Sequence, residues 1–273
     1  MNYKQCFLSI LTFLFLLSCT SKSQKPIQEK NDEAKKLTEP IDTDSIRLEK
    51  ALQSALKLAR EDYKQEVHVD SFSSTLNSPI SRIDTHVFTG NLFEDGNDYA
   101  LIKRKFVDRI RINLYKKKAE QLTELINYKE YHLNYIGDTI FDVNGDDRKD
   151  VVIHQYPTSG CCLANVRRVF LNLEEGFSNE YEFLNPTFSP KEHIIRGIEY
   201  GHPGHTDLYK YQWNGLTVDT LEYISFLRDH RKKVQSLDTL YRLNSNKDTV
   251  DILLELPKEY QHIEAIDWFL DKL

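Results

Sequence analysis

The spacing of apolar residues predicts one helix near the start of the chain. Between residues 42 and 66 they recur at intervals of three and four positions: Leu48, Leu52, Ala55, Leu56, Ala59 and Tyr63. This spacing puts them on one face of a helix, and Asp44 or Ser45 can cap the free amides at its start. We therefore predict a helix over residues 42–66.

After residue 66 apolar and polar residues alternate, which is typical of half-buried strands. Short β-branched or aromatic runs bounded by turn residues predict strands at Val67–Val69, Ile83–Thr89, Tyr99–Lys103, Arg109–Tyr115, Asp150–His154, Val166–Leu173, Ile194–Tyr200 and Asp207–Trp213. Asn214 and Gly215 favour a two-residue hairpin turn, so Leu216–Ile224 is expected to return as the next strand. The predicted fold class is therefore mainly β, preceded by one helix.

Two stretches of this region resemble each other, each with an acidic turn, an apolar strand, a loop and a second strand. They are Phe93–Tyr115 and Phe141–Leu173, and we expect a third unit at His193–Ile224 and a fourth at Leu237–Leu256. Repeated strand–turn units suggest a small propeller-like stack of about four antiparallel sheets, closed or open. The tail Pro257–Leu273 is expected to be helical, with a strand as the alternative.

The first eighteen residues have the pattern of an export signal. Lys4 precedes an apolar run from Phe7 to Leu17 that only Ser9 and Thr12 interrupt. Eleven residues rise about 17 Å as a helix, too little for a hydrocarbon core of about 30 Å. The run is therefore expected to be a signal core and not a transmembrane helix.

Leu16-Leu17-Ser18-Cys19 resembles the lipobox of bacterial lipoproteins, in which the cysteine is acylated and becomes the first mature residue. The resemblance implies a signal peptide over residues 1–18, lipidation such as palmitate at Cys19, and a mature protein anchored to a membrane. Thr20 is not acidic, so by analogy we expect the outer membrane, with the protein facing the periplasm or the cell surface.

The stretch after the lipobox is predicted to be a tether. Residues 19–41 are rich in charged residues, Ser, Gln and Pro, and almost lack large apolar side chains. Such a segment buries too little apolar surface to offset its chain entropy, so we expect disorder. The remaining organisation is expected to be the helix, a β-rich domain over residues 67–225, and a C-terminal extension over residues 226–273 that packs on it.

The charge of the chain argues against nucleic acid as a partner. The formal charge is −6, and it becomes −7 once residues 1–18, whose one charged side chain is Lys4, are removed. Nucleic-acid-binding proteins usually carry a clear positive excess. A basic run between Lys103 and Lys118 is either the solvated side of strands or a docking patch for an acidic partner.

The cysteines raise a further question. With Cys6 in the signal and Cys19 lipidated, the remaining thiols are the adjacent pair Cys161 and Cys162, which follow Gly160 in an expected loop tip. In an oxidising compartment they can form a vicinal disulfide or pair between chains, and a ring between neighbours is a strained local turn. Two buried free thiols are the alternative.

Residues 142–150 carry the most specific chemical pattern. Oxygen side chains stand at positions 1, 3, 5 and 9 of this stretch, as Asp142, Asn144, Asp146 and Asp150. A tight loop can turn them toward one centre, and calcium prefers six to eight oxygen ligands, which the Arg148 carbonyl and water would complete. Magnesium demands a stricter octahedron, and zinc prefers nitrogen or sulfur. We therefore predict a calcium site, with an acidic solvated hairpin as the alternative.

The loop differs from an EF-hand, because Gly145 stands at position 4 and not 6 and a strand follows where a helix would be required. Asp-x-Asn-Gly-Asp-x-x-x-Asp followed by Val-Val-Ile resembles the FG-GAP and VCBS repeats of calcium-binding β-propellers. Asp147 departs from that pattern, which has a second glycine there, so it either strains the turn or adds an oxygen. The related loop Phe93–Ala100 is shorter and lacks the final aspartate, so we expect it to be metal-free.

From Phe141 to about Trp213 the order of motifs resembles small calcium-binding propeller lipoproteins. The resemblance rests on the calcium loop, a strand ending Val-Phe-Leu-Asn, Phe183–Phe188 and Tyr209–Gly215. Some members of that group inhibit lysozyme-like cell-wall hydrolases delivered by rival bacteria. The resemblance implies a module that binds a protein partner, although fold alone does not determine function. We therefore expect a binding protein and not an enzyme.

Two other functions stay open at this stage. Exposed aromatic residues such as Tyr200 or Trp213 could bind a glycan. A metal-dependent hydrolase could use His202 and His205, which lie near His193 and Asp207 in the sequence. No His-Glu-x-x-His motif supports the hydrolase, and the chain has no Gly-x-Ser-x-Gly motif.

Overall fold

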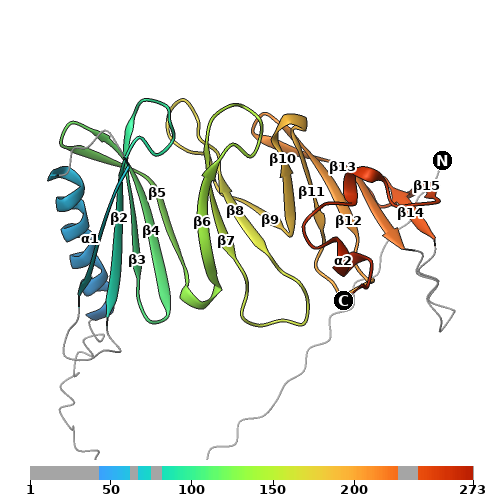
Figure 1. The fold of residues 1–273 in the computed structure, drawn as a ribbon, viewed down its shortest axis with the longest axis horizontal. Helices are drawn as coiled ribbons and strands as arrows, with labels where there is room; N and C mark the ends of the chain where they lie inside the picture. Colours follow the sequence, from blue (N-terminus) through green and yellow to red (C-terminus); the bar gives the residue numbers. More distant parts are fainter. Residues whose placement is uncertain (1–42, 62–66, 75–81, 227–238, 273) are drawn as a thin grey trace, which may run out of the picture. The chain divides into compact units, whose positions relative to one another are not determined.

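The computed structural model describes residues 43–61, 67–74, 82–226 and 239–272. The predicted signal peptide, the lipidation at Cys19 and the tether lie outside the described residues. The helices and strands drawn in Figure 1 are α1 (Thr43–Glu61), β1 (His68–Ser74), β2 (Ile83–Gly90), β3 (Asp98–Lys105), β4 (Arg109–Lys118), β5 (Gln121–Tyr131), β6 (Tyr135–Phe141), β7 (Asp150–Gln155), β8 (Val166–Phe170), β9 (Tyr181–Leu184), β10 (Pro186–Ser189), β11 (Ile194–Ile198), β12 (Leu208–Asn214), β13 (Thr217–Phe226), β14 (Leu240–Leu243), β15 (Thr249–Leu253) and α2 (Ile266–Phe269). Within these ranges, no helix combines the length and the apolar character needed to cross a bilayer.

The strands form three antiparallel sheets, which we call sheets 1, 2 and 3. Sheet 1 contains β1–β5, sheet 2 contains β6–β9, and sheet 3 contains β10–β15, each in chain order. Every strand therefore pairs with its neighbour along the chain, as hairpin connections require. The predicted turn at Asn214-Gly215 joins β12 to β13, with Asn214 opposite Thr217 and Gly215 at φ 60°. The prediction of a mainly β protein that begins with a helix is confirmed.

Sheet 2 has a hydrophobic core on each of its faces. Val151 and Ile153 of β7 pack into a core shared with β3, β4 and β5 of sheet 1. Val152 points to the opposite face, where it joins a core that includes Ile195 and Tyr209 of sheet 3. Since side chains alternate between the faces of a strand, a continuous Val-Val-Ile run is what a sheet covered on both sides requires.

The outer faces of sheets 1 and 3 are covered by segments from the two ends of the described chain. Leu52, Ala55, Leu56 and Ala59 of α1 pack on sheet 1, at residues such as Ile102. The C-terminal segment packs on sheet 3 through Tyr260, Ile263 and Phe269, which contact a core that includes Ile198, Leu208 and Ile224. No hydrophobic cluster among the described residues connects sheet 3 back to sheet 1. The sheets are thus stacked without a closed ring of described contacts.

The structure has three sheets where the repeats suggested about four units. β14 and β15 lie in the stretch predicted as a fourth unit, but β14 pairs with β13 and β15 pairs with β14, so both extend sheet 3. The tail is not one continuous helix. It contains a 3₁₀ turn at Lys258–Tyr260 and the single turn of α2, separated by Ala265 at φ 63°. A left-handed residue interrupts helical hydrogen bonding, which explains why the helical spacing there does not yield a long helix.

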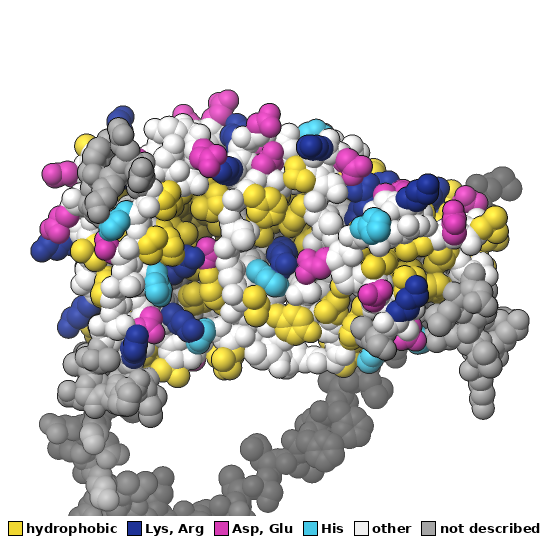
Figure 2. All heavy atoms as spheres, viewed as in Figure 1, with side chains coloured by type: hydrophobic (Ala, Val, Ile, Leu, Met, Phe, Trp, Pro, Cys, Tyr) yellow, Lys and Arg dark blue, Asp and Glu magenta, His cyan; other side chains and the backbone are white. Residues whose placement is uncertain are grey.

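Two residues of the basic run between Lys103 and Lys118, Arg104 and Lys117, are buried. Arg104 is 5% exposed and donates to the Leu48 carbonyl of α1 and to Asn113. Lys117 donates to the Ala59 carbonyl near the C-terminal end of α1, at 2.7 Å. Cations at a helix C-terminus satisfy its free carbonyls and interact favourably with its dipole. Neither a solvated strand face nor a docking patch describes these two side chains, and Figure 2 shows basic side chains interspersed with acidic ones.

The double-sided packing of β7 can be tested by a matched pair of substitutions. Ile153 is fully buried, whereas Ile136 of the adjacent β6 is 57% exposed. We expect Ile153→Ala to lower the free energy of unfolding by about 2–5 kcal/mol, because it leaves a cavity in the core. Ile136→Ala should cost less than about 1 kcal/mol. If chemical denaturation shows that Ile153→Ala and Ile136→Ala lower the free energy of unfolding equally, the stacking of sheet 2 against sheet 1 is contradicted.

Candidate functional site

The predicted calcium loop, residues 142–149, joins β6 to β7 at one end of sheet 2. Phe141 at the end of β6 pairs with Asp150 at the start of β7. Val143 within the loop is fully buried in the core between sheets 2 and 3. The loop is therefore fastened at the boundary of two sheets and is not a fully solvated hairpin.

Side-chain oxygens of the loop accept hydrogen bonds from its own backbone. Asp142 accepts from the N–H groups of Asn144, Gly145 and Asp147 at 2.6–3.2 Å. Asn144 accepts from Asp146 at 3.2 Å, and Asp146 accepts from Arg148 at 3.0 Å. Such bonds hold the loop in one tight conformation. A carboxylate oxygen has more than one acceptor site, so these contacts leave room for a cation.

Asp150 is the buried member of the set. Its exposed fraction is 0%, and its two oxygens accept the N–H groups of Val143 at 2.9 Å and Asn172 at 2.8 Å. Burial raises the pKa of Asp150 to about 7, and the nearby carboxylates of Asp146 and Asp142 act in the same direction, against the two backbone donors. Without a positive partner, this carboxyl group is costly to ionise inside the fold.

Two residues of the loop have left-handed backbone conformations, Gly145 at φ 84° and Asp147 at φ 63°. A Cβ on Gly145 would lie 2.1 Å from the Pro190 carbonyl oxygen, so only glycine fits there. The repeat pattern that the loop resembles has glycine at the position of Asp147, and a left-handed residue with a Cβ costs about 1 kcal/mol. The left-handed conformation agrees with the strained turn expected at Asp147, and the Asp147 N–H is bonded to Asp142.

His193 connects the loop to sheet 3. Its Nδ1 lies 2.6 Å from the Asn144 carbonyl oxygen, and its own carbonyl accepts the N–H of Trp213 at 2.9 Å. His193 itself has φ 55°, at the end of the 3₁₀ turn Pro190–Glu192. Sequence reasoning grouped His193 with His202 and His205 and missed this contact, because 49 positions separate it from Asn144.

The oxygen donors of the loop suit a hard cation, but the three aspartates are not gathered closely. Among the described His, Cys, Asp and Glu side chains, they form no group of three whose ligand atoms all lie within 4.8 Å of one another. The Arg148 guanidinium pairs with Asp146 at 2.8 Å. A calcium ion bound by Asp142, Asn144, Asp146 and Asp150 would therefore compete with Arg148 for Asp146.

The related loop between β2 and β3 is organised around one aspartate. Asp95 accepts from the Asn97 N–H at 2.9 Å and from the Tyr99 hydroxyl at 2.7 Å. Glu94 forms an ion pair with Lys149 of the calcium loop at 2.6 Å. The two loops are thus in contact, and the absence of metal at the first stays a prediction.

A cleft of about 760 Å³ borders the calcium loop, and we call it the loop cleft. It lies between connections of sheets 2 and 3, and its lining includes Asn144, Asp146, Glu174, Glu175, Trp213 and Leu216. Glu174 and Glu175 are exposed and Leu216 is 54% exposed. The loop cleft therefore combines acidic side chains with accessible apolar surface, and its volume is within the range of ligand-binding pockets.

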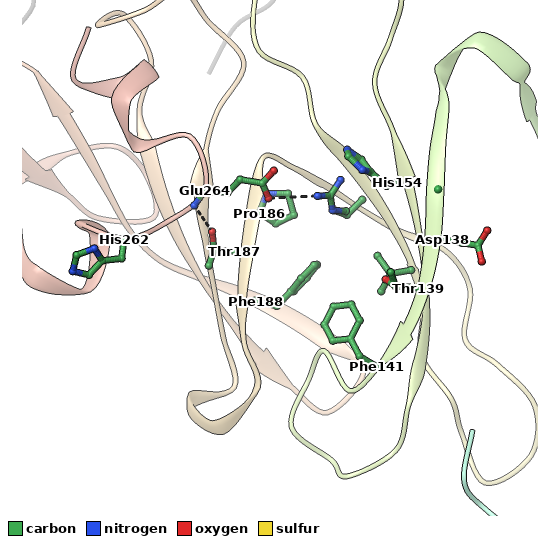
Figure 3. A pocket seen from close by; sticks show the side chains of 12 residues that line it. Asp138, Thr139, Phe141, His154, Pro186, Thr187, Phe188, His262 and Glu264 are labelled. Carbon is green, nitrogen blue, oxygen red and sulfur yellow. Dashed lines mark hydrogen bonds and ion pairs between the residues drawn. The ribbon is translucent and has the colours of Figure 1, made fainter. Parts of the chain in front are cut away.

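A second cleft of about 620 Å³ lies between the edge strands β6 and β10, and we call it the side cleft. Figure 3 shows Thr139, Phe141 and Phe188 facing its interior, and the two phenyl rings are 6.0 Å apart. Arg167 and Glu264 form an ion pair across it at 3.4 Å, which links sheet 2 to the C-terminal segment.

The adjacent cysteines lie in a loop beside a histidine. Cys161 is exposed and Cys162 is buried, both as free thiols with their sulfur atoms 2.8 Å apart. The His202 Nε2 lies 3.8 Å from the Cys161 sulfur. The hydrogen bond with Cys161 raises the pKa of the Cys162 thiol. The sequence could not reveal this contact, since 41 positions separate Cys161 from His202.

The residues considered for a hydrolase or a glycan site have separate side-chain contacts, although His202 and His205 share one turn, in which the His205 N–H donates to the His202 carbonyl at 2.9 Å. His193 contacts the calcium loop, His202 contacts Cys161, and Asp207 pairs with Lys247 at 3.0 Å. Trp213 is 6% exposed within the core between sheets 2 and 3, so the expectation that it is an exposed aromatic is wrong. Tyr200 is 54% exposed, as the glycan hypothesis required.

Comparison with known proteins identifies no relative. No family model matches the chain, and neither a curated protein nor a solved structure is significantly similar to it.

The raised pKa of Asp150 predicts how the stability of the metal-free protein depends on pH. In the unfolded chain the carboxyl ionises near pH 3.8, whereas in the fold its pKa is about 7. The folded state therefore binds this proton more tightly than the unfolded chain. The contribution of Asp150 to the free energy of unfolding is present in full below about pH 4, and it falls as the pH rises to about 7, by at most about 1.4 kcal/mol per pH unit. Denaturant unfolding in a calcium chelator should show this decline, and Asp150→Asn should flatten it. Identical pH profiles for both proteins would contradict the assignment.

Proposed function

We propose that this protein is a membrane-anchored lipoprotein whose calcium-stabilised, β-rich module binds a protein partner, with a lysozyme-like cell-wall hydrolase as the candidate. The single observation that carries the proposal is the position of the loop 142–149. It carries the oxygen donors Asp142, Asn144 and Asp146, is followed directly by Asp150 at the start of β7, and forms one wall of the loop cleft. A cation held there would stabilise a surface on which a partner could dock.

The chemistry of the loop supports calcium over other cations. Its side chains offer carboxylate and amide oxygens, and calcium supplies the positive charge that the buried Asp150 lacks. His193 and Val143 hold the loop 142–149 against sheet 3. The conformation of this loop therefore affects both walls of the loop cleft. Calcium would therefore act structurally, by favouring one conformation of the docking surface.

The stacking of the sheets supports the propeller-like part of the proposal. Propeller blades are antiparallel sheets of four strands in chain order, packed face to face. Sheet 2 matches one such blade, while sheets 1 and 3 have five and six strands. We describe the module as an open, propeller-like stack, in which loops at one end provide the contact surface.

Charge suggests the nature of the partner. Glu174 and Glu175 are exposed on the loop cleft next to Asp146, and Leu216 adds an exposed apolar side chain. A complementary partner would bring basic side chains around an apolar contact, since electrostatic complementarity sets specificity and the rate of association. On a lysozyme-like hydrolase that this protein inhibits, the complementary basic surface would overlap the substrate groove of the hydrolase.

Calcium binding is tested by comparing two loops of the same chain. Calcium at a hundred times its dissociation constant should stabilise the wild-type protein by about 2.7 kcal/mol, and a chelator should remove the effect. Asp146→Asn should weaken calcium binding because it removes one carboxylate, while its remaining oxygen can still accept the Arg148 N–H. Asp95→Asn, in the related loop, is the matched control and should bind calcium like the wild type. If the melting temperature measured by calorimetry does not change when calcium is added, the site is refuted.

The partner is tested by an inhibition assay with lysozyme on peptidoglycan, together with affinity capture in calcium. We expect the protein to inhibit lysozyme in calcium and less in chelator. Glu174→Lys should weaken inhibition about 10-fold, equivalent to about 1.4 kcal/mol, because it reverses a charge on the loop cleft. Glu120→Lys reverses a charge that is also exposed, in the β4–β5 turn away from the loop cleft, and should have no effect. Unchanged lysozyme activity, together with no captured hydrolase, would rule out this partner class.

A further inference from the structure

We propose that Cys161, Cys162 and His202 form a binding site for a soft or borderline metal cation of the class of Cu(I) or Zn(II). This site does not depend on the proposed function, because it shares no residue with the calcium loop. It also differs from the hydrolase hypothesis, in which His205 was the partner of His202.

The geometry brings three suitable ligand atoms together. The two sulfur atoms and the imidazole nitrogen all lie within 4.8 Å of one another, which no other group of three His, Cys, Asp or Glu side chains in the described residues achieves. The two sulfurs are 2.8 Å apart, and the Cys161 sulfur is 3.8 Å from the His202 Nε2. Two sulfurs on one zinc, each about 2.3 Å from it in a tetrahedron, are about 3.8 Å apart, so the two sulfurs must separate by about 1 Å when zinc binds.

The loop that carries His202 is braced from several sides. The Trp268 indole donates to the Gly201 carbonyl at 2.9 Å, and the Gly204 N–H donates to the Trp268 carbonyl at 3.0 Å. The His205 N–H donates to the His202 carbonyl at 2.9 Å. Metal ligands bind better when surrounding contacts hold them in place, and here the C-terminal segment provides those contacts.

The cysteine loop is held by a buried asparagine. Asn185 is fully buried, donates to the Leu163 carbonyl at 3.2 Å and accepts the Asn165 N–H at 2.8 Å. Burial and the nearby thiols of Cys161 and Cys162 together raise the pKa of the Tyr200 hydroxyl. The three ligands therefore come from two ordered loops, with a further polar group beside the sulfurs.

The ligand set selects the class of cation. Thiolate sulfur favours Cu(I) and Zn(II), whereas calcium and magnesium prefer oxygen. Binding requires deprotonated ligands, so each thiol that coordinates releases its proton to solvent and the neutral imidazole contributes its lone pair. Because Cys161 and His202 are exposed, a cation can enter from solvent without rearrangement of the core.

The test uses the full chain in detergent, reduced with a phosphine under anaerobic conditions, and titrated separately with Cu(I) and Zn(II) against chromophoric chelators. We expect one equivalent of at least one cation to bind, with Co(II) giving a thiolate charge-transfer band. Cys161→Ser/Cys162→Ser should abolish that equivalent. His202→Ala should weaken binding by at least about 10-fold, whereas the neighbouring His205→Ala should not.

The full chain also contains Cys6 and Cys19, so each result is read as the difference from the double serine variant. Cys161→Ser alone changes an exposed side chain and guards against a folding defect. If the wild type binds more Cu(I) or more Zn(II) than the double serine variant, the result supports the site and identifies its metal. Equal binding by wild type and the double serine variant, or equal losses from His202→Ala and His205→Ala, would overturn the proposal.

Discussion

The burial of both faces of sheet 2 is the constraint on which the rest of the described structure depends. Since alternate side chains of β7 point into opposite cores, the same strand stabilises its contacts with sheet 1 and with sheet 3. Sheets 1 and 3 then each have one remaining apolar face, which α1 and the C-terminal segment cover. The loop 142–149 emerges at this boundary, and its buried Val143 makes it part of the packing.

Four of the strands that sequence reasoning missed share a physical property. β5, β6, β9 and β10 are all edge strands of their sheets. Edge strands are less covered and carry more polar residues, so their alternation is weak: β6 has no buried residue, and β5 has two. The covered strands, such as Asp150–Gln155, have long apolar runs and were predicted. The count of units failed for the related reason that pattern alone cannot show whether β14 starts a new sheet or extends the previous one.

The features of the candidate sites also divide into those that the sequence could reveal and those that it could not. Residues 142–150 could be recognised because their oxygen donors are close in sequence, and the strained Asp147 was visible as a departure from a glycine pattern. The contacts of His193 with Asn144 and of His202 with Cys161 join segments that only the stacking of sheets and the C-terminal segment brings together. The buried roles of Arg104 and Lys117 were also hidden, because charged residues are rarely expected in a core.

The order of strands has a consequence for how the chain folds. Within each sheet every strand pairs with the next one along the chain, so each sheet can form through local connections at modest entropic cost. A low mean sequence separation of contacts favours rapid folding for a β protein. No sheet need wait for a distant stretch of chain before its hairpins pair, and stacking of finished sheets then adds the long-range contacts. A chain of this kind can acquire order progressively from one end to the other.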